Sequence, residues 1–173
     1  MSHGGHAPAA GEPVAHEPVF TGEVRAKLEA LFPKYPTRQA CLLPALWLVQ
    51  EARGWVSEPA LAEVAEVLGL TPAYVKGVVT FYTMYHTHPV GRHFIQVCTT
   101  SPCGLCGADD VLQAILAHSG CGDLGATSPD GRFTVVEVEC LGACGFATPV
   151  LVDDDFVEGV TPESVPALLS RYA

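Results

Sequence analysis

Basic residues are scarce in this sequence of 173 residues. Nine lysines and arginines stand against nineteen aspartates and glutamates, which leaves a formal net charge of −10. A protein surface of that sign repels the phosphate backbone of nucleic acids, so neither DNA nor RNA is an expected partner. The same charge suits docking to a basic protein surface.

Long apolar runs are also missing, although 49% of the residues are hydrophobic. The longest stretch, Ala40–Val49, is interrupted by Pro44 and is far shorter than the roughly 20 residues that span a bilayer. No transmembrane helix and no direct membrane insertion are therefore expected. The first basic residue is Arg25, so the amino-terminal segment matches neither a secretory signal nor an Arg-rich mitochondrial transit peptide. The expected location is the cytoplasm of a bacterium or an archaeon.

Two nucleotide-binding motifs are absent from the sequence. No G-x-G-x-x-G follows a predicted strand, and no G-x-x-x-x-G-K-[ST] occurs. These glycine-rich turns hold phosphate groups at the N-terminus of a helix. The chain is therefore not expected to bind NADH or to catalyse hydride transfer alone.

Cysteine, in contrast, is plentiful, with seven residues. The number is odd, and structural disulfides are rare in the cytoplasm, so metal or redox chemistry is the better interpretation. Five of the seven lie in two tight groups in the second half of the chain. The first group is CTTSPCGLC, from Cys98 to Cys106, and the second is CLGAC, from Cys140 to Cys144.

The residue pattern predicts a tail and two domains. Residues 1–19 are rich in Pro, Gly, Ala and His without an apolar period, which predicts a disordered tail. Residues 20–90 show helical spacing with frequent helix-ending signals, which predicts a small helical bundle. Residues 91–173 change to a strand, helix, strand, hairpin and helix pattern. The expected fold class is therefore α+β or α/β, with a boundary near residue 90.

Several local signals place the elements more closely. In the first domain, Ser57 and Thr71 are expected helix N-caps, and Gly54 and Gly69 are expected helix ends. The aromatic residues Phe81, Tyr82 and Tyr85 have helical spacing and are expected in the core. In the second domain we expect strands at 93–98 and 133–139, a hairpin at 149–152 and 156–157, and helices at 108–118 and 162–172.

Each cysteine group follows a predicted strand, so two loops would enclose a centre. Thiolate sulfurs are soft donors that select Zn, Cu(I) or iron–sulfur clusters. The residues between the cysteines are small, so backbone N–H groups can approach the sulfurs, which is one way of setting a reduction potential. A zinc site tolerates the same spacing. Spacing alone therefore favours iron–sulfur over zinc only slightly.

The spacing also leaves three ligand assignments open. Cys98, Cys103 and Cys106 with one distant cysteine match the plant-type ferredoxin pattern. The second assignment takes Cys98 and Cys103 from the first loop and Cys140 and Cys144 from the second. The third makes Cys103 and Cys106 a thioredoxin-type redox pair, which requires the pair to open a helix.

Beyond spacing, the sequence resembles a known family. The strings CTTSPCGLCGADDVL and VECLGACGFATPVLVDDDFVEGVTPE look like the NuoE-type subunit of bacterial respiratory complex I, NADH:quinone oxidoreductase. VQEARGWV and LGLTPAYVKGVVTFYTMY also match in order, so the resemblance covers roughly residues 20–173. It implies a helical bundle followed by a thioredoxin-like [2Fe–2S] ferredoxin domain. It also implies one [2Fe–2S] cluster bound by Cys98, Cys103, Cys140 and Cys144.

The resemblance further implies a function and a partner. The chain would be an electron-transfer subunit that exchanges single electrons with the FMN of a larger NuoF-type subunit, which also carries the NADH site and a [4Fe–4S] cluster. Such a carrier requires no acid, base or nucleophile, so no catalytic residues are expected. It would lie in the cytoplasm, peripheral to the inner membrane through the complex. The alternative is the equivalent subunit of an NAD-dependent formate dehydrogenase or an NAD(P)-linked hydrogenase. A zinc-stabilised or thioredoxin-like interaction domain without electron transfer is the remaining hypothesis.

Some residues depart from the family pattern. Cys106 stands where relatives more often have another residue, so it is interpreted as a spare thiol near the cluster that could replace a ligand. Pro149 lies one position later than in the commoner pattern, which affects the expected path of the loop over the cluster. Cys41 and Cys121 match no ligand position; Cys41 is expected in the helical core.

Overall fold

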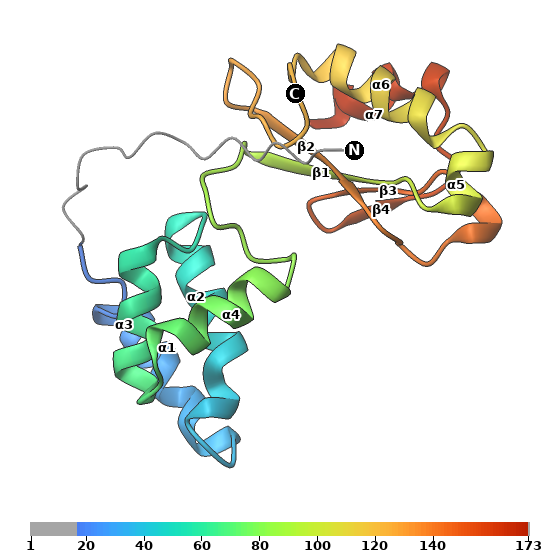
Figure 1. Ribbon diagram of the computed structural model, residues 1–173. Coiled ribbons are helices and arrows are strands. Elements are labelled where there is room, and N and C mark those ends of the chain that lie inside the picture. The colour runs from blue at the N-terminus through green and yellow to red at the C-terminus, as the bar shows by residue number, and fades with distance from the viewer. Residues whose placement is uncertain (1–16, 173) are drawn as a thin grey trace. The chain divides into compact units, whose positions relative to one another are not determined.

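The computed structural model describes residues 17–172 and divides into two compact units, Met1–His88 and Pro89–Ala173 (Figure 1). The helical unit is followed by a sheet unit, which confirms the expected fold class. The predicted tail over residues 1–19 falls almost entirely outside the described residues. The division into a tail and two domains stays a prediction.

The helical unit consists of four short α-helices linked by brief turns. A 3₁₀ turn continues from the end of the first helix, and a second one leads into the next helix. The four helices are α1 (Gly22–Leu31), α2 (Leu42–Arg53), α3 (Glu58–Leu68) and α4 (Pro72–Phe81).

The predicted caps account for where these helices begin and end. The Ser57 hydroxyl accepts a hydrogen bond from the Ala60 N–H at 3.4 Å, and the Thr71 hydroxyl accepts one from the Tyr74 N–H at 3.3 Å. Each satisfies an N–H group that has no partner within its own helix. Gly54 ends α2 in the left-handed region, at a φ of 80°, which glycine adopts without steric cost.

The core of the helical unit is apolar and continuous. Leu28, Leu46 and Val49 are fully buried, and Cys41 lies among them as expected. Tyr85 is also buried, and its hydroxyl donates to the Leu43 carbonyl at 2.8 Å.

The prediction of core positions was wrong for two aromatic residues of the helical unit. Phe81 is 76% exposed and Tyr82 is 39% exposed. The helix α4 ends at Phe81, and Tyr82 has an extended backbone. The helical spacing on which the prediction relied therefore ends at Phe81, so it does not determine which side chains are buried beyond that residue.

Within the described residues, no single helix is long and apolar enough to cross a membrane. The helices α3 and α4 reach that length and composition only when taken together, as a pair bent by 118°.

The second unit is built on a four-stranded sheet in the order β2-β1-β3-β4. The central strand β1 (His93–Cys98) pairs in parallel with β2 (Phe133–Val138) and antiparallel with β3 (Val150–Val152). The strand β4 (Asp155–Val157) completes the predicted hairpin with β3. Parallel neighbours need a long connection, and here the chain between β1 and β2 contains two helices.

The helices α6 (Ala108–Ser119) and α7 (Val165–Leu169) lie on the same side of this sheet (Figure 1). Val111 and Ile115 of α6 are buried together with Ile95 and Val135 of the two parallel strands. The sheet and α6 thus form one apolar core.

The C-terminal helix predicted at 162–172 is broken into three short pieces. A 3₁₀ turn, Pro162–Ser164, precedes α7, and another, Ser170–Tyr172, follows it. Pro166 has no N–H to donate to the carbonyl four residues earlier, so a regular α-helix cannot run through this turn.

Candidate metal centre

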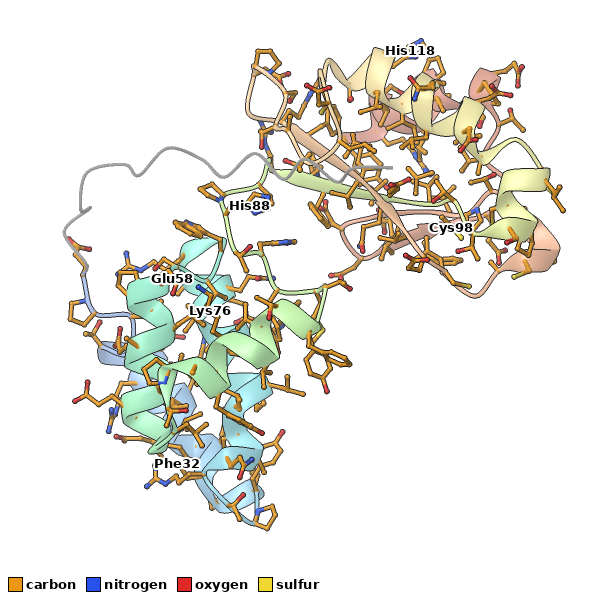
Figure 2. The ribbon with its side chains drawn as sticks, in the orientation of Figure 1. Phe32, Glu58, Lys76, His88, Cys98 and His118 are labelled. Atoms are coloured by element: carbon orange, nitrogen blue, oxygen red, sulfur yellow. The ribbon has the colours of Figure 1, made fainter. Side chains whose placement is uncertain are left out.

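The two cysteine groups lie at the same edge of the sheet because β1 and β2 run in parallel. Cys98 is the last residue of β1, at the end of the strand that leads into α5 (Ser101–Leu105) (Figure 2). Its neighbour in the β2 register is Val138, and Cys140 follows two residues later. The sheet topology therefore places the start of each cysteine loop at one edge.

The first group combines a strand end with a short helix. Cys98 is 2% exposed, and Cys103, the third residue of α5, is 1% exposed. The sequence indicated only a loop here. The overlooked signal was Pro102, since proline is favoured in the first turn of a helix.

The second group is more open. Cys140 and Cys144 are both exposed. The Gly142 N–H donates to the Cys140 sulfur at 3.4 Å, and Gly142 has a φ of 80°. A 3₁₀ turn, Cys144–Phe146, then leads towards β3, which begins directly after Pro149.

The pKa values of the two buried cysteine thiols, Cys98 and Cys103, move in opposite directions. Burial raises the pKa of the Cys103 thiol, and its hydrogen bond to the Cys98 sulfur raises it further. Burial also raises the pKa of Cys98, but the N–H groups of Leu141 and Thr100 and the bond from Cys103 outweigh it, so this pKa falls below its usual value. Cys98 therefore loses its proton more readily than Cys103, and donors from both loops face its sulfur.

The structure brings the predicted ligands together only in part. Cys144 and Cys106 are close enough to Cys103 to raise its pKa. Cys98 donates to the carbonyl of Glu139, which directly precedes Cys140, at 3.7 Å. Within residues 17–172, however, no three His, Cys, Asp or Glu side chains converge as they would on a single metal ion.

The donor set and its surroundings fit a [2Fe–2S] cluster. Sulfur is the ligand such clusters use, and backbone N–H groups already face the sulfurs of Cys98 and Cys140. In the same loop, Thr148 Oγ1 is buried and has no hydrogen-bond partner among the described residues. A buried hydroxyl without a partner is costly, and the structure shows no compensating contact for it among the described residues.

The remaining cysteines have other surroundings. Cys106 follows the last residue of α5, so the Cys103–Cys106 pair ends a helix and does not open one. The thioredoxin-type interpretation of this pair is therefore wrong. Cys121 is buried, and its thiol donates to the Phe133 carbonyl at 3.4 Å, which gives it a structural role in the sheet core.

Comparison with known proteins agrees with this geometry. Residues 28–173 match the family model described as thioredoxin-like [2Fe–2S] ferredoxin. The chain is 40% identical to the E subunit of the NADH-quinone oxidoreductase of Pseudomonas aeruginosa, over 89% of this chain and 92% of that protein. It is 38% identical to the E 2 subunit of the NADH-quinone oxidoreductase of Rhizobium meliloti, over 86% of this chain and 88% of that protein.

Two further relatives are longer than this chain. The mitochondrial NADH dehydrogenase [ubiquinone] flavoprotein 2 of Dictyostelium discoideum is 42% identical over 88% of this chain, which spans 62% of that protein. A chain of an NAD⁺-reducing [NiFe]-hydrogenase in the H₂-reduced state has the same fold, with a TM-score of 0.64 at 23% identity. That match covers 76% of this chain and 22% of the hydrogenase chain.

Proposed function

Because this chain belongs to the thioredoxin-like [2Fe–2S] ferredoxin family and to the NuoE-type subunits of NADH-quinone oxidoreductase, we propose that it carries electrons within such a complex. It holds one [2Fe–2S] cluster and exchanges single electrons with the FMN of a larger NuoF-type partner. The observation that supports this most strongly is the meeting of two cysteine groups at the end of two parallel strands.

In this proposal each loop supplies two ligands. Cys98 and Cys103 come from the end of β1 and from α5, and Cys140 and Cys144 come from the loop after β2. When bound, the cluster supplies one-electron transfer.

The surrounding backbone favours the ligand form of the cysteines. The N–H groups of Leu141 and Thr100 donate to Cys98, and that of Gly142 donates to Cys140. Such bonds stabilise negative charge on sulfur and so help to set the reduction potential.

The sequence contains no glycine-rich dinucleotide-binding turn in the strand-to-helix context that such a turn requires. The letters G-x-G-x-x-G occur once, at 120–125, but this segment follows α6 and does not join a strand to a helix N-terminus. NADH and FMN are therefore assigned to the partner.

Two other hosts use an equivalent module, namely NAD-dependent formate dehydrogenases and NAD(P)-linked hydrogenases. The relatives of 38–40% identity are NADH-quinone oxidoreductase subunits, which favours NADH-quinone oxidoreductase as the host complex. The genes that neighbour this one would distinguish the hosts.

The first test is the metal content of anaerobically purified protein, with EPR after dithionite reduction. We expect two irons and two sulfides per chain and a rhombic S = 1/2 signal. One zinc and no iron, from cells supplied with iron, would overturn the electron-carrier function and leave a structural zinc module.

A further inference from the structure

Two buried hydroxyl groups lie at the cysteine edge, the end of the sheet at which the two cysteine loops begin. Three buried side-chain polar atoms among the described residues have no hydrogen-bond partner, namely Thr100 Oγ1, Thr148 Oγ1 and Arg132 Nε. Arg132 Nε has the Asp130 carboxylate as an ion-pair partner at 3.3 Å. Buried polar atoms without a partner are rare, so the two threonine hydroxyls need a physical explanation.

Thr100 occupies the N-cap of α5, the short helix that carries Cys103. At the same position of α3 and α4, the hydroxyls of Ser57 and Thr71 each accept a hydrogen bond from the N–H group three residues later. The equivalent donor for Thr100 is the N–H group of Cys103, but the Thr100 side chain makes no such cap bond. The Thr100 hydroxyl is therefore not used to stabilise the start of its helix.

Of the two buried hydroxyls, that of Thr100 acts on a cysteine sulfur. The N–H group and the hydroxyl of Thr100 are both close enough to the Cys98 sulfur to lower the pKa of that thiol. The hydroxyl contributes less than the N–H group, which agrees with a hydrogen bond that is not fully formed. A hydroxyl hydrogen rotates to suit its acceptor. The acceptor within reach of the Thr100 hydroxyl is thus the sulfur of a proposed ligand.

The adjacent Thr99 shows a different use of the same side chain. Its hydroxyl donates to the Glu137 carboxylate at 3.5 Å, and its N–H group donates to the Val138 carbonyl at 3.3 Å. Two consecutive threonines therefore direct their hydroxyls to different places, one to a carboxylate on β2 and the other towards a cysteine sulfur. This contrast provides a matched control within the same loop.

A hydrogen bond to a ligand sulfur affects the reduction potential of an iron–sulfur centre. One added electron makes the centre more negative by one charge, and a hydrogen-bond donor stabilises the more negative state more strongly. The interaction is stronger where water is excluded, as it is at Cys98, which is 2% exposed. A donor on a side chain, unlike a backbone N–H group, can be removed by a single substitution.

We propose that the Thr100 hydroxyl donates a hydrogen bond to the Cys98 sulfur when that sulfur is an iron ligand, and thereby raises the reduction potential of the cluster. Thr100 acts through Cys98, so it is a positioning residue for electron transfer. The inference rests on the proposed function, because it requires a cluster at Cys98. A bond made in the loaded protein accounts for a hydroxyl that neither caps its helix nor has another partner among the described residues.

The proposal is tested by EPR-monitored redox titration of the anaerobically purified, iron-loaded protein. Thr100→Val removes the hydroxyl and keeps the shape of the side chain. We expect the reduction equilibrium to shift about tenfold towards the oxidised form, which for one electron is a potential about 59 mV lower. Thr100→Ser retains the hydroxyl and should titrate close to the wild type. Thr99→Val is the matched control and should also titrate like the wild type.

A loaded Thr100→Val protein with the wild-type potential would overturn the proposal, as would equal shifts for Thr99→Val and Thr100→Val. A hydroxyl that only supported the fold would change the free energy of unfolding and leave the potential unchanged. If Thr100→Val binds no iron, Thr100→Ala is titrated in its place. Loss of the cluster from both variants would also contradict the proposal, because the hydroxyl would then be required for assembly.

Iron content, measured on every protein, separates this inference from the proposed function. Iron-free wild-type protein would refute the proposed function and the inference that rests on it. Iron-loaded variants that all titrate like the wild type would refute only the role of Thr100.

Discussion

The helical unit and the ferredoxin unit have similar numbers of residues but differ in charge and in how their buried residues are arranged. Residues 1–88 carry six basic and eight acidic side chains, whereas residues 89–173 carry three and eleven. The helical unit has one continuous apolar core, while the ferredoxin unit has a sheet core and, apart from it, a small cluster around Cys98, Cys103 and Ala108. The buried residues of the helical unit thus form a single core, whereas in the ferredoxin unit a separate small cluster surrounds two of the cysteines.

The difference indicates where each unit depends on something besides its own chain. Only three buried residues make up the cluster at the cysteine edge, with Leu141 and Ala147 partly buried against it. So little apolar burial contributes little to holding the two loops. We therefore expect ligand binding to order this edge, since metal-binding free energy is also folding free energy.

The largest expected effect is the loss of the cluster from the ferredoxin unit when a cysteine ligand is removed. Cys144→Ala should abolish the normal cluster, because it removes a proposed ligand from the second loop. Iron content and the reduced EPR spectrum measure the loss.

The matched control for that variant is Cys106→Ala, which should leave the spectrum nearly unchanged. If Cys106→Ala removes the cluster and Cys144→Ala does not, the plant-type ferredoxin spacing describes the ligands instead.

The next largest effect is a substitution that destabilises the helical unit and leaves the ferredoxin unit unchanged. Leu46→Ala removes a fully buried side chain from α2 and should lower the free energy of unfolding by about 2–5 kcal/mol. Denaturant unfolding followed by circular dichroism measures this, and the cluster spectrum should persist under native conditions. A cost as small as that of Leu124→Ala, at a 42% exposed site, would contradict the assigned core.

A smaller effect tests the local signals on which the helical unit depends. Ser57→Ala removes the hydroxyl that caps α3 and should cost about 1 kcal/mol of unfolding free energy. Ser57→Gly is the control and should cost only a few tenths of a kcal/mol. Equal losses for the two variants, measured by denaturant unfolding, would show that the cap bond contributes nothing.

The smallest effect is a dependence on alkaline pH that belongs to the helical unit. Burial, and to a lesser degree Tyr82, raises the pKa of Tyr85 to about 12, from an ordinary value of 10.0. The folded core holds the neutral phenol, so the Tyr85 contribution to stability is complete below pH 10 and is lost as the pH rises towards 12.

Tyr85→Phe measures this contribution. At neutral pH the variant should be about 1 kcal/mol less stable, because the hydrogen bond to the Leu43 carbonyl is lost. The gap between wild type and variant should narrow between pH 10 and 12 in denaturant titrations. A stability difference that stays constant between pH 10 and 12 would show that the Tyr85 phenol is not buried in the folded protein.

The helical unit was predictable from sequence wherever the signals are local. Ser57, Thr71, Gly54 and Gly69 mark helix ends because each acts on N–H or backbone groups within one turn. The prediction failed at Phe81, where exposure depends on where the chain turns away and not on helical spacing.

The ferredoxin unit shows what local patterns omit. Its strands follow from alternating apolar residues, but the parallel pairing of β1 with β2 joins residues 40 positions apart, such as Ile95 and Val135. No local signal gives that register. The cysteines were identifiable by spacing, whereas the position of Thr100 at the N-cap of α5 emerged only from the structure, because the sequence indicated a loop there.

That long parallel pairing also has a consequence for the order of assembly. The helical unit is made first on the ribosome, and its contacts are mostly local, so it can fold early. Cys98 and Cys103 emerge long before Cys140 and Cys144, and the two loops meet only when β2 has docked beside β1. A cluster held by the four proposed ligands can therefore be inserted only at a late step, after β2 has docked beside β1.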